Sequence, residues 1–233
     1  MSQNRIPVAI LGATGPVGQK AIAMLVDHPR FRIEELAASD QRSGKSYGEC
    51  VDWREEKALP REIAAMKLKP IQEVASRQVI SALPAEIAIE AEPMLASRGQ
   101  NVFSNASAYR MGKDIPLLVP EVNRSHLAIA GRQTTSGKII TNPNCSTVFL
   151  VGALRPLQDL GEIEHVNVVT MQSLSGAGYP GVPSFDLLGN VIPHISGEED
   201  KIQAETKKIL GGLEKPAAFG VTVHVHRVPV HYG

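Results

Sequence analysis

The chain has 233 residues, of which 43% are hydrophobic and 21% charged, a balance that suits a folded globular protein and excludes intrinsic disorder. Lys and Arg together number 24, as do Asp and Glu, so no charge surplus attracts nucleic acid or an anionic membrane surface. Two cysteines exclude a disulfide framework, and no apolar run approaches the ~20 residues that span a bilayer. We therefore expect a cytoplasmic protein without nucleic-acid or membrane partners.

The first part of the chain alternates strand and helix patterns. The apolar stretch 6–11 leads through a glycine-rich turn into a helical pattern, and a second strand is predicted over 33–38. Further strands are predicted over 78–83 and 101–104, with a helix over 85–98 between them. This alternation predicts an α/β fold, a Rossmann-type doubly wound parallel sheet with right-handed crossovers. Residues 46–75 lack a sustained period, and we predict strand and loop there.

The pattern changes near residue 140, which predicts a domain boundary at that point. Residues 1–140 form the expected Rossmann-type domain and residues 141–233 a second, α+β domain. The predicted elements of the second domain are a helix from Cys145, a strand over 166–172, a glycine-rich loop over 175–181, a helix over 198–210 and a strand over 221–230.

Three glycines connect the first strand to the first helix. Gly12, Gly15 and Gly18 have G-x-x-G-x-x-G spacing, which lets a pyrophosphate approach the backbone at the positive end of the helix. The alternative is a tight turn that binds no ligand. The residues of this turn predicted to contact a dinucleotide are Gly12, Thr14, Gly15, Pro16 and Val17.

A polar turn over 39–45 follows the second predicted strand, where dinucleotide enzymes recognise the adenosine ribose. Arg42 can make forked contacts to a 2'-phosphate, with Ser39, Ser43 and Lys45 assisting, so the turn favours NADP. Two alternatives stay open. Asp40 could accept from an unphosphorylated ribose, or the turn could be a solvated surface segment.

Cys145 stands at the start of a predicted helix, within the sequence NPNCST over 142–147. Unpaired backbone N–H groups and the positive helix end favour a thiolate, so this is a suitable position for a nucleophile. Without that context a lone cysteine is more often an inert small residue of the core.

The chain resembles the aspartate-semialdehyde dehydrogenase family, in particular the branch typical of archaea and fungi. Five blocks carry the resemblance in the same order, and it covers essentially the whole chain. The blocks are residues 12–18 (GATGPVG), 81–84 (SALP), 143–147 (PNCST), 172–181 (QSLSGAGYPG) and 227–230 (RVPV).

The resemblance implies NADPH-dependent reduction of aspartyl-4-phosphate to aspartate 4-semialdehyde, or its phosphorylating reverse, within the aspartate-family amino-acid pathway. Cys145 would form the covalent thioester, and Gln172 would orient it. Arg227 would bind the substrate α-carboxylate and Glu198 the substrate ammonium. The residues implied at the phosphate are Arg110, Asn144 and Lys201, and the further residues implied at the cofactor are Ser81, Leu83, Ser175 and Gly176. The second domain would be catalytic and would join subunits into a homodimer or homotetramer.

The sequence departs from the family pattern at one position. The family's acid-base histidine would fall at position 234, after Gly233, so we expect either a fragment of a longer product, with an incomplete second domain, or a chain without that catalyst. His231 lies three residues too early to replace it, because three steps along a strand reverse the side chain's face. His224 and His226 share a strand face but have no evident third ligand, so we expect no metal.

Three other functions fit parts of the pattern. Malonyl-CoA reductase shares the scaffold, and N-acetyl-glutamyl-phosphate reductase shares the chemistry but usually has glycine where Asn144 stands. The third alternative is a truncated, non-catalytic NADP-binding protein.

Overall fold

The computed structural model describes residues 5–178 and 181–230. The chain divides into two compact units. The N-terminal unit comprises Met1–Pro116 and Ala128–Asn142, and the C-terminal unit comprises Leu117–Leu127 and Pro143–Gly233. No helix in the described ranges is long and apolar enough to cross a membrane.

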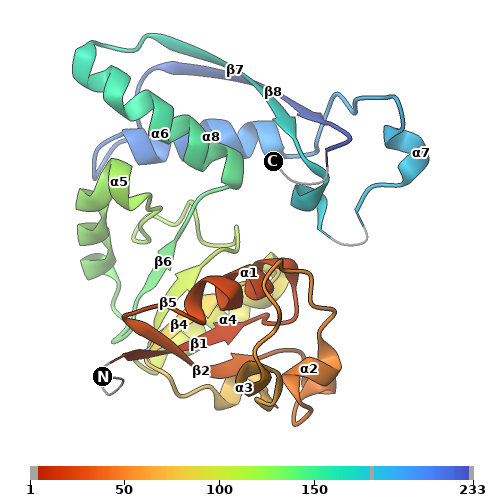
Figure 1. Ribbon diagram of the computed structural model, residues 1–233. Helices are drawn as coiled ribbons and strands as arrows, with labels where there is room; N and C mark the ends of the chain where they lie inside the picture. The colour runs from red at the N-terminus through yellow and green to blue at the C-terminus, as the bar shows by residue number, and fades with distance from the viewer. Residues whose placement is uncertain (1–4, 179–180, 231–233) are drawn as a thin grey trace. The chain divides into compact units, whose positions relative to one another are not determined.

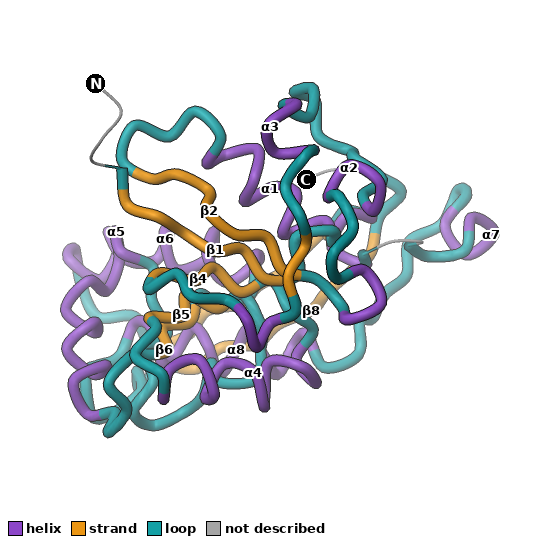
Figure 2. The backbone as a smooth tube through the Cα atoms, turned by 90° about the horizontal axis from the view of Figure 1, so that it is seen from below, coloured by secondary structure: helices purple, strands orange, loops and turns teal. Residues whose placement is uncertain are grey.

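The N-terminal unit is built on a six-stranded sheet in the order β3-β2-β1-β4-β5-β6, and every neighbouring pair is parallel. This order confirms the predicted doubly wound Rossmann-type fold. Figures 1 and 2 show the strands lying side by side with helices beside the sheet. The strands are β1 (Ile6–Leu11), β2 (Phe31–Ala37), β3 (Leu68–Lys69), β4 (Gln78–Ser81), β5 (Asn101–Ser104) and β6 (Ile139–Thr141).

Strand β1 is buried on both faces because its side chains alternate between two cores. Ile10 packs in a cluster with Ile22 of α1 (Pro16–Leu25), whereas Leu11 packs in a second cluster with Leu95 of α4 (Ala85–Ser97). A strand that is covered on both sides has a continuous run of apolar residues, and this run is the feature from which β1 was predicted. The turn that follows β1 lies at the carboxyl end of this parallel sheet, where dinucleotides bind in this fold.

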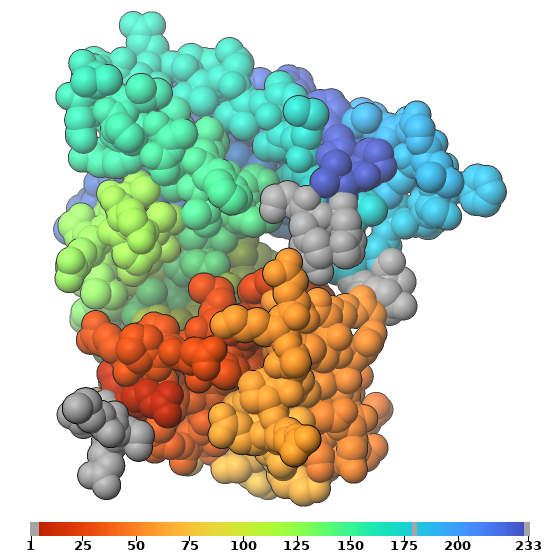
Figure 3. Space-filling view, viewed as in Figure 1, coloured from red at the N-terminus to blue at the C-terminus, as the bar shows by residue number. Residues whose placement is uncertain are grey.

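The segment 46–75 differs from the prediction of strand and loop. It contains two single-turn helices, α2 (Tyr47–Cys50) and α3 (Arg61–Ala64), before the short strand β3. Helix α2 begins with a capping box between Ser46 and Glu49, a signal present in the sequence, but one turn is too short to show a helical period. Figure 3 shows this segment, in orange, on the surface of the N-terminal unit.

Glu35 is a buried carboxylate that ties β2 to the chain before β4. Only 5% of the residue is exposed, and it accepts hydrogen bonds from Lys69 Nζ at 2.7 Å and from the backbone N–H groups of Ala75 and Ser76 at 3.1 and 2.7 Å. Burial of the carboxylate raises its pKa, but the hydrogen bonds from Lys69, Ser76 and Ala75 outweigh burial and lower the pKa from 4.5 to about 2.

We expect Glu35→Gln to lower the free energy of unfolding by ~3 kcal/mol at pH 7, because a pKa lowered from 4.5 to about 2 means that the folded state favours the ionised carboxylate. The folded-state pKa is depressed, so this stabilisation is complete above pH 4.5 and is lost as the pH falls towards 2. Urea unfolding of both proteins between pH 7 and pH 3 measures the difference. Glu34→Gln, on the exposed face of the same strand, serves as control. A gap between Glu35→Gln and the parent that stays constant over this range would contradict the assignment.

The C-terminal unit has a parallel pair of strands, β7 (His165–Gln172) and β8 (Gly220–Arg227), in register from His165↔Gly220 to Gln172↔Arg227. One face of the pair packs with α6 (Cys145–Leu160) and α8 (Glu198–Leu210) in a core that includes Val151, Ile202 and Val223. This second domain with its own sheet was also predicted. The helices are α5 (Pro120–Asn123), α6 (Cys145–Leu160), α7 (Ser184–Leu187) and α8 (Glu198–Leu210).

Candidate active site

The turn between β1 and α1 is closed so tightly that two of its positions accept only glycine. Gly12 has a φ of +67°, and a Cβ there would lie 2.5 Å from the Ala82 carbonyl oxygen. A Cβ on Gly18 would lie 2.3 Å from the Gly12 oxygen. The predicted glycine spacing therefore has a steric cause in the N-terminal unit.

The start of α1 offers backbone donors to an anion. Gly15 caps the helix without a side-chain hydrogen bond, and Pro16 has no N–H to satisfy. Among the described residues no acceptor is found for the N–H groups of Val17 and Gly18, and the Val17 residue is half exposed. Unsatisfied donors at the positive end of a ten-residue helix suit a pyrophosphate.

Two side chains donate hydrogen bonds to backbone carbonyl oxygens of this turn and so fix its conformation. Gln19 donates from Nε2 to the Thr14 carbonyl oxygen at 3.0 Å, and the Tyr47 hydroxyl donates to the Ala13 carbonyl oxygen at 2.9 Å. Tyr47 is fully buried and belongs to α2, the helix that the sequence did not predict. The dinucleotide turn is thus held by a residue that its own motif does not reveal.

Arg42 reaches this turn from the end of β2. It lies in a 3-10 turn over Asp40–Arg42, and its Nη1 donates to Thr14 Oγ1 at 2.5 Å. Ser39 and Ser43 flank the same turn and are exposed. The structure therefore brings together the residues predicted for the pyrophosphate and those predicted for the 2'-phosphate.

The remaining predicted residues of the N-terminal unit are largely buried. Ser81 is fully buried, and its carbonyl oxygen accepts from both Asn105 N and Asn105 Nδ2, at 2.9 and 3.1 Å. Leu83 is 8% exposed. Arg110 is 9% exposed and donates from Nη2 to the Asn105 carbonyl oxygen at 2.7 Å. The turn after β4 is therefore connected to the segment that carries Arg110.

Cys145 is the first residue of α6, and Asn144 caps this helix. The Asn144 Oδ1 atom accepts from the Ser146 N–H at 2.9 Å and lies 3.9 Å from Cys145 Sγ. Cys145 is exposed, whereas Cys50 is half-buried. The positive end of a sixteen-residue helix stabilises negative charge on an exposed sulfur, so the geometry suits a nucleophilic thiolate.

Two carboxylates on α8 hold the cap. Asn144 Nδ2 donates to Glu198 Oε2 at 2.6 Å, and Lys201 Nζ donates to Glu198 Oε1 at 3.1 Å. The backbone N–H of Asn144 donates to Glu205 Oε2 at 2.7 Å. The structure thus joins three predicted substrate residues, Asn144, Glu198 and Lys201. Sequence reasoning missed Glu205, although its spacing of seven from Glu198 places both on one helical face.

Gln172 and Arg227 lie side by side at the ends of β7 and β8. Arg227 is 6% exposed, and its Nη1 donates to the Ser173 carbonyl oxygen at 2.5 Å. A Cβ on Gly176 would lie 3.0 Å from the same Nη1, so the loop with Ser175 and Gly176 packs closely on the guanidinium. Tyr179 and Pro180 of the loop motif lie outside the described residues, as does His231.

His224 and His226 lie on one face of β8, opposite Val169 and Met171 of β7. In the described part of the chain, no group of three or more His, Cys, Asp or Glu residues is arranged to hold a metal ion.

Residues 7–130 match the family described as "Semialdehyde dehydrogenase, NAD binding domain", and residues 154–233 match "Semialdehyde dehydrogenase, dimerisation domain". The aspartate-semialdehyde dehydrogenase of Archaeoglobus fulgidus is 50% identical over 97% of this chain and 68% of its own length. The enzymes of that name from Methanothermobacter thermautotrophicus and Schizosaccharomyces pombe are 46% and 44% identical. The chain belongs to the aspartate-semialdehyde dehydrogenase family. It spans about two thirds of the length of these relatives.

Solved structures of the aspartate-semialdehyde dehydrogenase family have the same fold. The Candida albicans enzyme, determined with NADP, gives a TM-score of 0.89 at 36% identity over 97% of this chain and 68% of that one. Aspartate semialdehyde dehydrogenase II from Vibrio cholerae, complexed with ASA, gives a TM-score of 0.79 at 29% identity over 98% of this chain and 72% of that one. The resemblance inferred from the five sequence blocks is confirmed.

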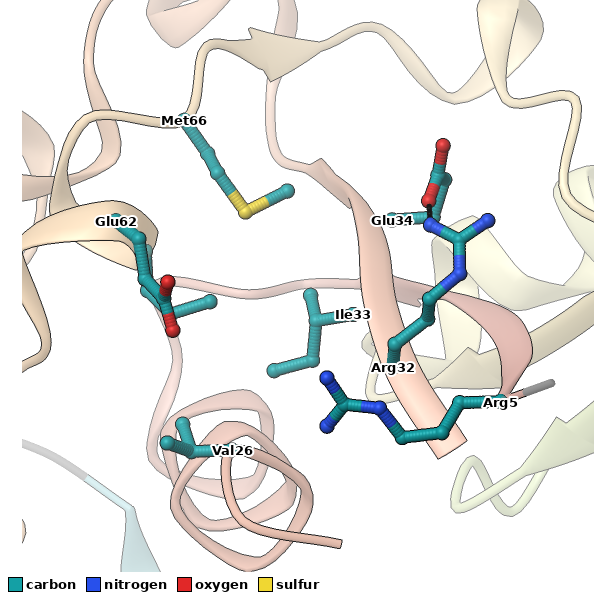
Figure 4. A pocket seen from close by; sticks show the side chains of 8 residues that line it. Arg5, Val26, Arg32, Ile33, Glu34, Glu62 and Met66 are labelled. Atoms are coloured by element: carbon teal, nitrogen blue, oxygen red, sulfur yellow. Dashed lines mark ion pairs between the residues drawn. The ribbon is translucent and has the colours of Figure 1, made fainter. Parts of the chain in front are cut away.

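A hollow of about 380 Å³ in the N-terminal unit lies away from the groups described above (Figure 4). It lies where β2 begins, whereas ligands of doubly wound sheets bind at the carboxyl ends of the strands. We therefore do not assign it to the cofactor of an aspartate-semialdehyde dehydrogenase. Its lining residues are Arg5, Val26, Arg32, Ile33, Glu34, Glu62, Ile63 and Met66.

Proposed function

We propose that the chain reduces aspartyl-4-phosphate to aspartate 4-semialdehyde with NADPH, and catalyses the phosphorylating oxidation in reverse, through a thioester on Cys145. The observation that carries this proposal is the exposed Cys145 at the start of α6, capped by Asn144, which Glu198 holds in turn. This function belongs to the aspartate-family amino-acid pathway.

NADP fits the N-terminal unit. The N–H groups at the start of α1 can donate hydrogen bonds to the pyrophosphate. Gly12 and Gly18 have no side chains, so the turn can close tightly below the pyrophosphate. The Arg42 guanidinium, held against Thr14, is a forked donor for a 2'-phosphate. When bound, the cofactor supplies or accepts the hydride.

In the reductive direction, the Cys145 thiolate attacks the acyl carbon of aspartyl-4-phosphate and inorganic phosphate departs with the bonding electrons, which leaves a thioester. After hydride transfer to the thioester carbon, the carbon–sulfur bond breaks, and the products are the free aldehyde and the thiolate. No acceptor for the Cys145 N–H is found among the described residues, so this donor can stabilise the negative oxygen that forms at each step.

The substrate groups have matching partners in the chain. Arg227 presents a buried guanidinium whose fork suits the α-carboxylate. Glu198 suits the ammonium, and Lys201 beside it supplies positive charge for phosphate. Gln172 pairs in register with Arg227, and we assign it the role of orienting the thioester. Arg110, Asn144, Ser81, Leu83, Ser175 and Gly176 keep the substrate and cofactor roles that the resemblance implies.

A comparison of substrates tests this function. The protein as its gene encodes it is assayed for NADPH formation from aspartate semialdehyde, phosphate and NADP⁺, and separately for NADPH consumption with malonyl-CoA. We expect turnover in the first assay and at least ~100-fold lower kcat/KM in the second, a difference of the size that unpaired substrate-binding groups produce. Turnover of malonyl-CoA alone would reassign the chain to that reductase, and tight NADP binding without turnover of either substrate would favour the non-catalytic alternative.

Arg42→Ala should weaken NADP⁺ binding by ~10- to 100-fold and leave NAD⁺ binding nearly unchanged, because the substitution removes a charge-assisted contact worth ~1.5 to 3 kcal/mol. Calorimetric titration with both cofactors measures the two affinities. Arg61→Ala, which removes an exposed cation on α3, is the control and should change neither. Equal affinities of the parent protein for NADP⁺ and NAD⁺ would contradict the assignment of Arg42 to the 2'-phosphate.

We further propose a homodimer or homotetramer in the cytoplasm. The match of residues 154–233 to a dimerisation domain supports the assembly, and the two free cysteines suit a reducing compartment. Light scattering coupled to size-exclusion chromatography gives the mass of the assembly.

A further inference from the structure

We propose that Glu205 of α8 is a positioning residue that fixes the Asn144 cap and, through it, the nucleophile Cys145. This inference rests on the proposed function, because it gives Glu205 a role in the same reaction. Glu205 lies 60 residues after Cys145 and belongs to none of the five sequence blocks that identify the family.

The contact is short and buried. Glu205 is 2% exposed, and its Oε2 accepts the backbone N–H of Asn144 at 2.7 Å. Glu198, two helical turns earlier on the same face of α8, accepts the Asn144 side-chain amide at 2.6 Å. Helix α8 thus holds Asn144 at two points, one on its backbone and one on its side chain.

The backbone N–H of Asn144 needs such an acceptor. Asn144 is the cap of α6, and the N–H groups at a helix start have no partner within the helix. The Ser146 N–H is satisfied by the Asn144 side chain, but Asn144 cannot satisfy its own N–H in the same way. Without Glu205, rotation of the Asn144 peptide would move both the cap and the adjacent Cys145.

The Glu205 carboxylate acts through the position of its acceptor oxygen and not through its negative charge. A negative group beside the start of α6 opposes the negative charge that Cys145 must carry, so its charge alone would slow the reaction. A hydrogen bond from a buried backbone N–H, in contrast, keeps the helix start ordered. The oxygen position of residue 205 therefore matters more than its ionisation.

Two substitutions of Glu205 separate the effect of the oxygen position from the effect of the charge. Glu205→Gln keeps an acceptor oxygen at the same distance and removes the charge, whereas Glu205→Asp keeps the charge and withdraws the oxygen by one methylene group. Ile202→Val, a small core change on α8 outside the cap contacts, is the control for stability. Each protein is tested for amide hydrogen exchange at Asn144 and Ser146, for the rate of Cys145 alkylation by iodoacetamide, and for kcat and KM.

We expect Glu205→Gln and Ile202→Val to stay within ~3-fold of the parent in every readout. Glu205→Asp should speed amide exchange at Asn144 and Ser146 by ~10-fold or more. It should lower kcat by a similar factor with little change in KM. The reason is that losing one buried hydrogen bond changes an equilibrium constant by about one to two powers of ten. The opposite order, with Gln impaired and Asp intact, would overturn the proposal and assign the role to charge. Unchanged exchange in both variants would also overturn it. If Cys145 of the parent is not the faster-labelled cysteine, the proposed function fails, while hydrogen exchange still tests the cap.

Discussion

Replacing Cys145 with serine should lower kcat at least ~1,000-fold, because a hydroxyl at this helix start does not ionise near neutral pH and cannot form the thioester. Steady-state NADPH formation from aspartate semialdehyde and phosphate measures the loss. The fold should be kept, since Cys145 is exposed and the Asn144 cap does not need the sulfur.

Cys50→Ser is the matched control. Cys50 is a half-buried residue at the end of α2 that packs against the apolar cluster around Tyr47, so its replacement should leave kcat near that of the parent. Substantial turnover by the Cys145→Ser protein, or its loss only in Cys50→Ser, would rule out Cys145 as the nucleophile.

Arg227→Ala should lower kcat/KM for aspartate semialdehyde by ~100-fold or more, mostly through KM, because a buried charge-assisted pair with a carboxylate is worth ~3 kcal/mol when one partner is removed. Arg227→Lys should recover only part of this, since a single ammonium cannot reproduce the forked geometry. The measurement is kcat/KM over a range of semialdehyde concentrations.

Arg227 also supports the loop after β7, since it donates to Ser173 and lies against Gly176. Thermal unfolding of the variants therefore accompanies the kinetics, and Arg155→Ala, an exposed cation paired with Asp159 on α6, is the control. A kcat/KM for Arg227→Ala within a few-fold of the parent in a folded protein would remove Arg227 from the substrate site.

The sequence predicted the parallel sheet of the N-terminal unit because its central strands are covered on both faces and read as apolar runs. Ile10 and Leu11 face different cores, so neither position tolerates a polar residue. Helices α2 and α3 were missed because four residues are too few for a period, and tertiary contacts such as the Tyr47 hydrogen bond to Ala13 hold them in place.

The site was predictable where its chemistry lies in contiguous motifs. The closed turn from Gly12 to Gly18 and the capped helix start at Asn144 and Cys145 each lie within a few residues of sequence. Contacts between distant segments were not predictable in this way. The pairing of Arg42 with Thr14 and that of Glu205 with Asn144 join residues 28 and 61 positions apart, and only the folded chain brings them together.

The covalent intermediate tests the central claim most directly. The protein is mixed with aspartate semialdehyde and NADP⁺ in the absence of phosphate, quenched in acid and digested, and each cysteine-containing peptide is weighed by mass spectrometry. Without phosphate the thioester has no acceptor, so we predict one equivalent of NADPH per active site and an aspartyl group on the peptide that contains Cys145. An unmodified Cys145 together with NADPH formation, or an acyl group on another residue, would contradict the account.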